Sequence, residues 1–132
     1  MLSHVMLGTS HFDNALYFYR PLMQLLGLQE RFCDPRRLWA AWETAPGIRP
    51  LFIIGQPYDH GTASAGNGQM VALLAPSRKI VDQAYAIALQ QGGTDEGSPC
   101  LRPEYHASYY GAYFRDLDGN KLCVVCHSTE TV

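Results

Sequence analysis

The chain has 132 residues, of which 47% are hydrophobic and 17% charged, and its formal net charge is −2 at neutral pH. This length suits one domain with its own core, and the composition excludes a disordered chain, a coiled coil and a collagen-like fibre. The slightly acidic balance gives no reason to expect nucleic acid or an anionic membrane surface as a partner. No apolar run is long enough to span a bilayer, and the N-terminus lacks the features of a secretory signal.

The four cysteines could form disulfides, but nothing in the sequence suggests secretion, so we expect a cytoplasmic protein with free, mostly buried thiols. Cys123 and Cys126 have the C-x-x-C spacing, but they lie in an apolar run that is typical of a strand. Residues three apart on a strand point to opposite faces of the sheet, so no disulfide is expected between these two.

The first half of the chain has the pattern of one strand, one helix and three further strands. Residues 3–7 form an apolar strand, and apolar side chains recur at helical spacing from Asp13 to Leu26. Asp13 is expected as the N-cap of this helix, and Gly27 as the residue that ends it. Three strands are predicted next, over residues 28–33, 37–42 and 50–56.

A segment rich in Gly, Ala, Ser and Asp, residues 57–67, is typical of a linker, and after it the same order of elements returns. A strand over residues 69–74 is followed by a helix with Ser77 as its N-cap and Gly92-Gly93 at its end. The remaining elements are an irregular or strand-like stretch, a strand, a hairpin turn and a last strand, at residues 94–105, 109–115, 118–120 and 121–127.

The two halves repeat at a nearly constant interval, with His4 and Met70 separated by 66 residues. The sequence therefore predicts two βαβββ modules, over residues 1–57 and 68–127, within a single domain spanning residues 1–132. One helix cannot cover both faces of a sheet. We therefore expect an α+β fold in which the modules pair edge to edge, helices outside, and form a curved mixed sheet with a concave pocket.

Three stretches carry a family pattern. They are an opening strand that begins His4-Val5 and leads into F-D-N-A-L-Y-F-Y, the segment G-N-G-Q-M-V-A-L at 66–73, and Y-Y-G-A-Y-F-R-D-L-D-G-N-K-L at 109–122. Together they resemble the vicinal oxygen chelate superfamily, which contains glyoxalase I, extradiol dioxygenases, and bleomycin and fosfomycin resistance proteins. The resemblance covers nearly the whole chain and implies the fold more firmly than one activity, because this fold hosts several chemistries.

The resemblance also implies four equivalent metal-ligand positions, one on the first and one on the last strand of each module. In this chain they are matched to His4, Phe52, Met70 and Cys123. Only the first is a conventional ligand for the family's divalent cations, because Phe has no donor atom and the two sulfur side chains prefer softer ions. No cofactor is therefore expected, although a divalent metal stays an alternative, and Phe52, Met70 and Cys123 are predicted to form the floor of a substrate pocket.

The richest cluster of polar and aromatic residues lies in a loop that leads into a strand of the second module. Arg102 is expected to bind a carboxylate or phosphate of the substrate, and Tyr105 to hydrogen-bond to it. His106 and Tyr110 are predicted as acid–base groups, together with His4, because imidazole is a side chain suited to proton transfer in the physiological pH range. The alternatives are loop aromatics that only pack on the sheet, and a His4 that is a hydrogen-bonded core residue.

Trp39 and Trp42 are three residues apart on a predicted strand, so they face opposite sides of the sheet. We expect Trp39 to line the cavity; core or interface packing of both is the alternative. A homodimer is also expected, because Trp39, Trp42, Phe52 and Tyr58 gather in or near the first module and interface centres select aromatic residues. Whether the two chains exchange modules stays open.

Two functions follow from the resemblance, and whether the protein is an enzyme stays open between them. The first is a glyoxalase-like lyase or isomerase, related to lactoylglutathione lyase, with a degenerate metal site and a small oxygenated substrate. The second is a non-catalytic protein that sequesters a small aromatic or cationic compound, as bleomycin resistance proteins do. Exposed carboxylates near the cavity favour the second function, and a coordinated metal favours the first.

Overall fold

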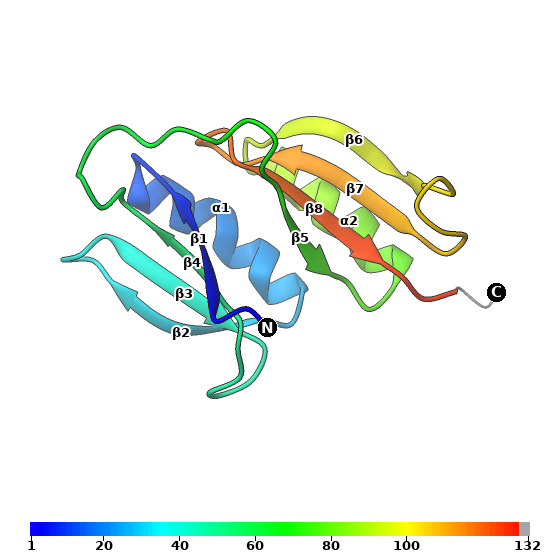
Figure 1. Ribbon diagram of the computed structural model, residues 1–132, viewed down its shortest axis with the longest axis horizontal. Coiled ribbons are helices and arrows are strands. Elements are labelled where there is room, and N and C mark those ends of the chain that lie inside the picture. Colours follow the sequence, from blue (N-terminus) through cyan, green and yellow to red (C-terminus); the bar gives the residue numbers. More distant parts are fainter. Residues whose placement is uncertain (130–132) are drawn as a thin grey trace.

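The computed structural model describes residues 1–129 (Figure 1). Its elements are β1 (His4–Gly8), α1 (Phe12–Leu25), β2 (Gln29–Asp34), β3 (Trp39–Glu43), β4 (Leu51–Gly55), β5 (Val71–Leu74), α2 (Arg78–Gln90), β6 (Thr94–Leu101), β7 (Tyr110–Arg115) and β8 (Lys121–Cys126). The order βαβββ occurs twice, as the sequence repeat predicts. Within residues 1–129, neither helix has the length and apolar character needed to cross a membrane.

Each repeat forms its own four-stranded mixed sheet, with strand orders β1-β4-β3-β2 and β5-β8-β7-β6. The first strand of each repeat is parallel to the last, and the other pairs are antiparallel. Figure 1 shows the sheets side by side, with β1 and β5 as the neighbouring edges and both helices on the same side. The α+β fold of two βαβββ modules is therefore confirmed. Within residues 1–129, the strands form two separate four-stranded sheets, one per module, rather than one continuous hydrogen-bonded sheet.

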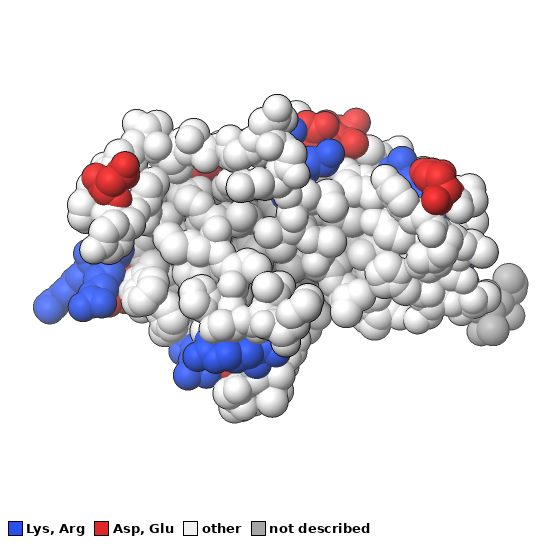
Figure 2. All heavy atoms as spheres, viewed as in Figure 1, with Lys and Arg blue, Asp and Glu red and all other residues white. Residues whose placement is uncertain are grey.

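The core lies between the helices and the sheets, where Phe18, Tyr19, Leu22 and Phe114 are fully buried. Because both helices cover the same side, neither helix covers the other face of either sheet, the open face. On the first sheet, Ala41, Leu51 and Ile53 are still buried on that face, in a small apolar cluster with Phe32 and Trp39. Figure 2 shows this open face as mostly uncharged in the middle, with charged side chains around its periphery. The open face is thus a surface on which a ligand has room to bind.

The helix ends confirm two expectations and correct one. Helix α1 begins at Phe12 with His11 as its N-cap, so Asp13 is not the cap as expected. Asp13 lies in the first turn instead, where its carboxylate is favoured by the positive end of the helix dipole. Ser77 caps α2 by accepting a hydrogen bond from the Ile80 N–H at 3.2 Å. Gly27 ends α1 with φ +79°, a conformation that glycine adopts without steric cost.

Pro21 lies inside α1, although proline has no N–H to donate within a helix. The carbonyl of Tyr17, one turn earlier, therefore lacks its usual helical donor. The Gln91 Nε2 at the end of α2 donates to this carbonyl at 3.4 Å. The carbonyl that the proline leaves without a helical donor thus forms a hydrogen bond between the helices of the two modules.

The turn between β7 and β8 also connects the modules. The Asp116 carboxylate accepts a hydrogen bond from the Tyr19 hydroxyl of α1 at 2.6 Å. It also accepts from the backbone N–H groups of Asp118 and Asn120 at 2.9 Å each. Asn120 in turn donates to the Gly8 carbonyl of β1 at 3.0 Å. Burial raises the pKa of Asp116, and the hydrogen bonds that it accepts oppose the rise. The D-L-D-G-N segment therefore has a structural role in this chain.

Candidate functional site

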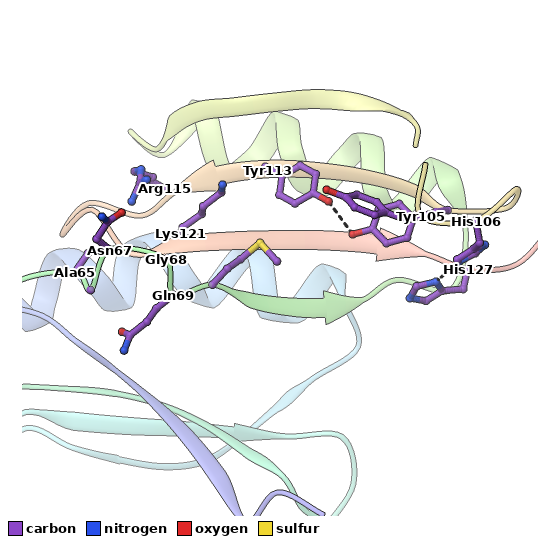
Figure 3. Close-up of a pocket in the computed structure, with 13 residues that line it drawn as sticks. Ala65, Asn67, Gly68, Gln69, Tyr105, His106, Tyr113, Arg115, Lys121 and His127 are labelled. Carbon is purple, nitrogen blue, oxygen red and sulfur yellow. Dashed lines mark hydrogen bonds between the residues drawn. The ribbon is translucent and has the colours of Figure 1, made fainter. Parts of the chain in front are cut away.

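The candidate site lies on the open face of the second sheet, and strand alternation decides which residues reach it. On β8, Leu122, Val124 and Cys126 pack into the core under α2. Lys121 and Cys123 therefore point to the opposite face. A cavity of about 880 Å³ occupies this face, lined by Ala65, Gly66, Asn67, Gly68, Gln69, Met70, Tyr105, His106, Tyr109, Tyr113, Arg115, Lys121 and His127 (Figure 3).

Two tyrosines and one cysteine form a hydrogen-bonded group at the floor of the cavity. The hydroxyl oxygens of Tyr109 and Tyr113 are 2.8 Å apart, and the Tyr109 oxygen is 3.5 Å from the Cys123 Sγ. Burial raises the pKa of Tyr109, Tyr113 and Cys123, so all three keep their protons near neutral pH. The group therefore offers neutral hydrogen bonds to a ligand rather than a thiolate or phenolate nucleophile.

His106 and His127 form an imidazole pair at the other end of the cavity (Figure 3). The His106 Nε2 and the His127 Nδ1 are 2.8 Å apart, and the ring centroids are 5.1 Å apart with an angle of 25° between the planes. The rings therefore meet nearly edge to edge, along the line of the hydrogen bond. The Ser108 N–H donates to the His106 Nδ1 at 3.1 Å, so in the neutral pair His106 carries its proton on Nε2 and donates it to His127.

Among residues 1–129, the cavity has positive side chains in its lining and no acidic one. Lys121 lies with its Nζ 5.6 Å from the centroid of the Tyr113 ring, and the Arg102 Cζ lies 5.1 Å from the same centroid. Arg115 also reaches the cavity, but its guanidinium pairs with Glu96. Lys121 has no carboxylate partner among the described residues. The arrangement therefore favours an aromatic ligand with a negative group over a cationic one.

Several of the predicted site residues meet in this cavity. Met70, Tyr105 and His106 line it, and Cys123 lies beneath it in contact with Tyr109. Arg102 does not line the cavity but packs on Tyr113, where its Nη2 donates to the Ser98 carbonyl at 3.0 Å. The Arg102 Nε is buried and has no hydrogen-bond partner in the described part of the chain.

Tyr110 does not reach the cavity, which corrects its prediction as an acid–base group there. Its hydroxyl donates to the Asp82 Oδ1 of α2 at 2.6 Å, and its ring packs beside the core. Burial, with the Asp82 hydrogen bond, raises the pKa of Tyr110 to about 12. The neighbouring Tyr109 occupies the cavity side instead, because successive strand residues point to opposite faces.

Phe52 is also on the wrong face for a pocket residue. It is buried in the core, where its ring packs on Tyr19 and Trp42 with centroids 5.4 Å and 6.4 Å away. In the parallel pairs, Met6 lies opposite Ile53 just as Ala72 lies opposite Cys123. The residue equivalent to Cys123 is therefore Ile53, and a shift of one residue in the internal alignment moves the side chain to the other face.

The other two predicted residues lie on the first module. His4 begins β1, outside the cavity lining, and its Nδ1 is 2.9 Å from the Ser3 Oγ. Trp39 faces the open side of the first sheet and lines a different cavity, while Trp42 is in the core. The opposite orientation of the two tryptophans is thus confirmed.

The residues at the four metal-ligand positions do not fit a divalent cation. Ile53 has no donor atom, Met70 offers a thioether, and the Cys123 thiol keeps its proton and contacts Tyr109. Hard divalent cations need carboxylate, imidazole or water oxygen and nitrogen donors. Among residues 1–129 there is no group of three His, Cys, Asp or Glu side chains that could hold a metal.

Sequence reasoning missed Tyr109, Tyr113, Lys121 and His127 as site residues. The alternation along the last two strands was an available signal for Tyr113 and Lys121, since Cys123 and these residues share one face. His127 carries no such signal, because it follows the last strand and its contact with His106 comes from the fold.

Solved structures similar to this chain include a glyoxalase/bleomycin resistance protein from Albidiferax ferrireducens T118. It is 31% identical, with a TM-score of 0.85 over 96% of this chain and 98% of its own. A glyoxalase/bleomycin resistance protein/dioxygenase family enzyme from Burkholderia phytofirmans PsJN is 18% identical, with a TM-score of 0.70 over 96% of this chain and 98% of its own.

A lactoylglutathione lyase from Agrobacterium tumefaciens is 18% identical, with a TM-score of 0.64 over 96% of this chain and 92% of its own. At this identity, the similarity to the Burkholderia and Agrobacterium proteins shows a shared fold and no more. Neither a scan against protein-family models nor a search of curated proteins found a match.

Proposed function

Because the chain belongs to the glyoxalase/bleomycin resistance protein family, we propose that it binds a small aromatic acid on the open face of its second sheet. One observation carries this proposal: among the described residues, the cavity is lined by three tyrosines, two histidines and two cationic residues, and by no carboxylate. A cationic ligand, which the sequence left open, finds no counter-charge in the part of the lining that the structure describes.

The binding mode follows from the positions of the side chains. Tyr105 and Tyr109, whose ring centroids are 4.9 Å apart, provide aromatic surfaces against which a planar ligand packs. The hydroxyl groups of Tyr109 and Tyr113 offer hydrogen bonds to its polar atoms. Lys121 supplies the opposite charge for an acidic group.

Isothermal titration calorimetry with 4-hydroxybenzoate tests this function. We expect saturable binding, and a loss of about tenfold in affinity in Lys121→Gln, because a hydrogen bond to a charged group is removed. Lys79→Gln, at an exposed position on α2, is the matched control and should bind like the wild type. Equal affinities in the two variants, or tighter binding of the cation benzylammonium, would contradict the proposal.

A second candidate function, acid–base catalysis of the lyase or isomerase type, is supported by the imidazole pair. Its hydrogen bond fixes which nitrogen of each ring carries a proton. The imidazoles can then take a proton from a carbon next to a carbonyl and return it elsewhere on the substrate. This mechanism uses His106 and His127 and no metal.

Hydrogen–deuterium exchange tests this candidate without knowledge of the natural substrate. In heavy water, the protein should speed exchange at the carbon beside the carbonyl of 2-hydroxyacetophenone, as followed by NMR. His106→Asn should abolish the acceleration, and His11→Asn, at an exposed position before α1, should leave it unchanged. Binding without any acceleration would leave the protein in the non-catalytic class.

A further inference from the structure

We propose that the turn between β2 and β3, together with the linker after β4, forms a second ligand site that takes the phosphate monoester of an aromatic compound. A cavity of about 730 Å³ lies there, and its lining includes Arg36, Arg37, Trp39, Tyr58 and His60. It shares no lining residue with the cavity on the second sheet. The two sites are therefore distinct.

The positive charge of this site comes from two successive arginines. Arg36 and Arg37 both line the cavity, and neither guanidinium group has an ion pair or hydrogen bond with the described residues. The nearby Asp34 carboxylate accepts hydrogen bonds from the backbone N–H groups of Arg36 and Arg37, at 3.0 Å and 3.3 Å. It fixes the turn and leaves the guanidinium donors available for a dianion. Figure 2 shows cationic side chains gathered over this turn, at the left of the view.

The aromatic part of the ligand is matched by Trp39 and Tyr58. The Trp39 ring packs on Phe32, with centroids 4.7 Å apart, which holds the indole at the cavity wall. Residue 55 is glycine, which lets the Trp39 and Met6 side chains pack closely against the backbone there. A Cβ on Gly55 would lie 3.0 Å from the Trp39 Cβ and 3.2 Å from the Met6 Cε. Tyr58 is fully exposed on the linker, so it can pack on the other side of a planar ring.

The β2–β3 turn and the linker after β4 each contain one non-glycine residue with a positive φ angle. Leu38 and His60 have φ values of +55° and +61°, in the left-handed region that disfavours residues other than glycine. Hydrogen bonds keep both in place: the Gln56 N–H donates to the Leu38 carbonyl at 3.1 Å, and the His60 N–H donates to the Pro57 carbonyl at 2.9 Å. Such strain gathers at ligand sites, where the surrounding structure fixes it.

The two tryptophans make NMR a direct test, because each gives one indole N–H signal. Titration of the labelled full chain with phenyl phosphate should shift the Trp39 signal saturably. The Trp42 signal should stay in place, because that ring is buried on the helix side, only 2% exposed. Arg36→Gln combined with Arg37→Gln should weaken binding at least about tenfold, since charge-assisted hydrogen bonds are lost. Arg20→Gln, on α1, is the matched control and should bind like the wild type.

Three results would overturn the proposal: no saturable shift of Trp39, equal binding of the uncharged analogue phenol, or unchanged affinity in the double arginine variant. Circular dichroism checks that the variants fold. If the double variant fails to fold, competition in the wild type decides instead. Inorganic phosphate should displace phenyl phosphate from Trp39, and a failure to compete would contradict the role of the two arginines.

Discussion

Tyr109 and Tyr110 are neighbours in the sequence, but their side chains lie on opposite faces of the sheet and have different partners. The Tyr109 hydroxyl contacts Tyr113 and Cys123 in the cavity, whereas the Tyr110 hydroxyl donates to Asp82 on α2. Both are tyrosines with a raised pKa, so residue type and titration do not separate them. What separates them is the face of the sheet to which each side chain points, because that face determines whether the phenol lies in the cavity or against helix α2.

The donor set at the four family metal positions leads to a prediction. Purified protein should hold no stoichiometric divalent metal, because Ile53, Met70 and Cys123 do not provide the donors that hard cations require. Inductively coupled plasma mass spectrometry measures this directly. About one Ni, Zn, Fe or Mn ion per chain, lost in His4→Ala, would show that a metal site exists despite these residues.

Tyr19→Phe tests the buried hydrogen bond to Asp116. Tyr19 is fully buried, and removal of its hydroxyl leaves a buried carboxylate oxygen without this donor. We expect the free energy of unfolding to fall by about 1–3 kcal/mol, measured by urea denaturation. Tyr85→Phe is the matched control, because the Tyr85 hydroxyl also donates to a carboxylate, that of Asp95, but at an exposed position. Its cost should be below about 0.5 kcal/mol, and similar losses in both variants would refute a special role for Asp116.

At the scale of elements, the Glu43 side chain links β3 to the neighbouring strand β2 and to the loop that follows β3. Its carboxylate accepts hydrogen bonds from Gln29 at 3.5 Å and Arg31 at 3.2 Å, both on β2, and from the Gly47 N–H at 3.1 Å. Burial acts to raise the pKa of Glu43, but the hydrogen bonds from Gly47, Arg31 and Gln29 outweigh it, so the pKa lies below its usual value. The ionised carboxylate thus helps to hold the first hairpin and the loop that follows it.

Acid should therefore weaken the fold through Glu43. A carboxyl whose pKa is lower in the folded than in the unfolded state contributes stability above its unfolded pKa, and loses it as the pH falls through the folded value. Thermal unfolding measured from pH 6 to pH 3 should show a smaller loss of stability in Glu43→Gln than in the wild type. Glu104→Gln, at an exposed loop position, is the control that should keep the wild-type profile. Parallel profiles in all three proteins would contradict this role.

At the scale of the whole molecule, the edges between the two sheets expose apolar side chains. Leu74 on β5 is 71% exposed, and Met6 on β1 and Met70 before β5 are 47% and 44% exposed. The aromatic area that the sequence suggested for an interface is smaller than expected, because Trp42 and Phe52 are in the core. We base the expectation of a homodimer on the exposed Leu74 and Met6 side chains instead.

We expect light scattering at micromolar concentration to give about twice the chain mass of 14.7 kDa, since two-fold dimers are the commonest soluble oligomers. Leu74→Asp should shift the mass toward the monomer, because it places a charge in the apolar patch. Tyr17→Asp is the matched control, since Tyr17 is 68% exposed but lies on α1, on the helix side. A wild-type mass near 14.7 kDa would refute the dimer.

The sequence by itself determined the order of the elements, the internal repeat and the fold, because these depend on local periodicity, caps and turns. The helix of the first repeat, the Ser77 cap and the Asp118-Gly119 turn all follow from residues close together in the chain. Part of the site could also be predicted from the sequence, since the predicted site residues His106, Tyr105 and Met70 do line the cavity.

Only the tertiary structure decided which side chains share the site. The placement of Tyr110 and Phe52 depended on strand registers, in which an error of one residue exchanges the two faces of a sheet. The contact between His106 and His127 joins a loop to the end of β8, 21 residues later, and no local pattern encodes it. The family metal positions likewise became unambiguous only when the pairing of β1 with β4 placed Ile53, not Phe52, opposite Met6.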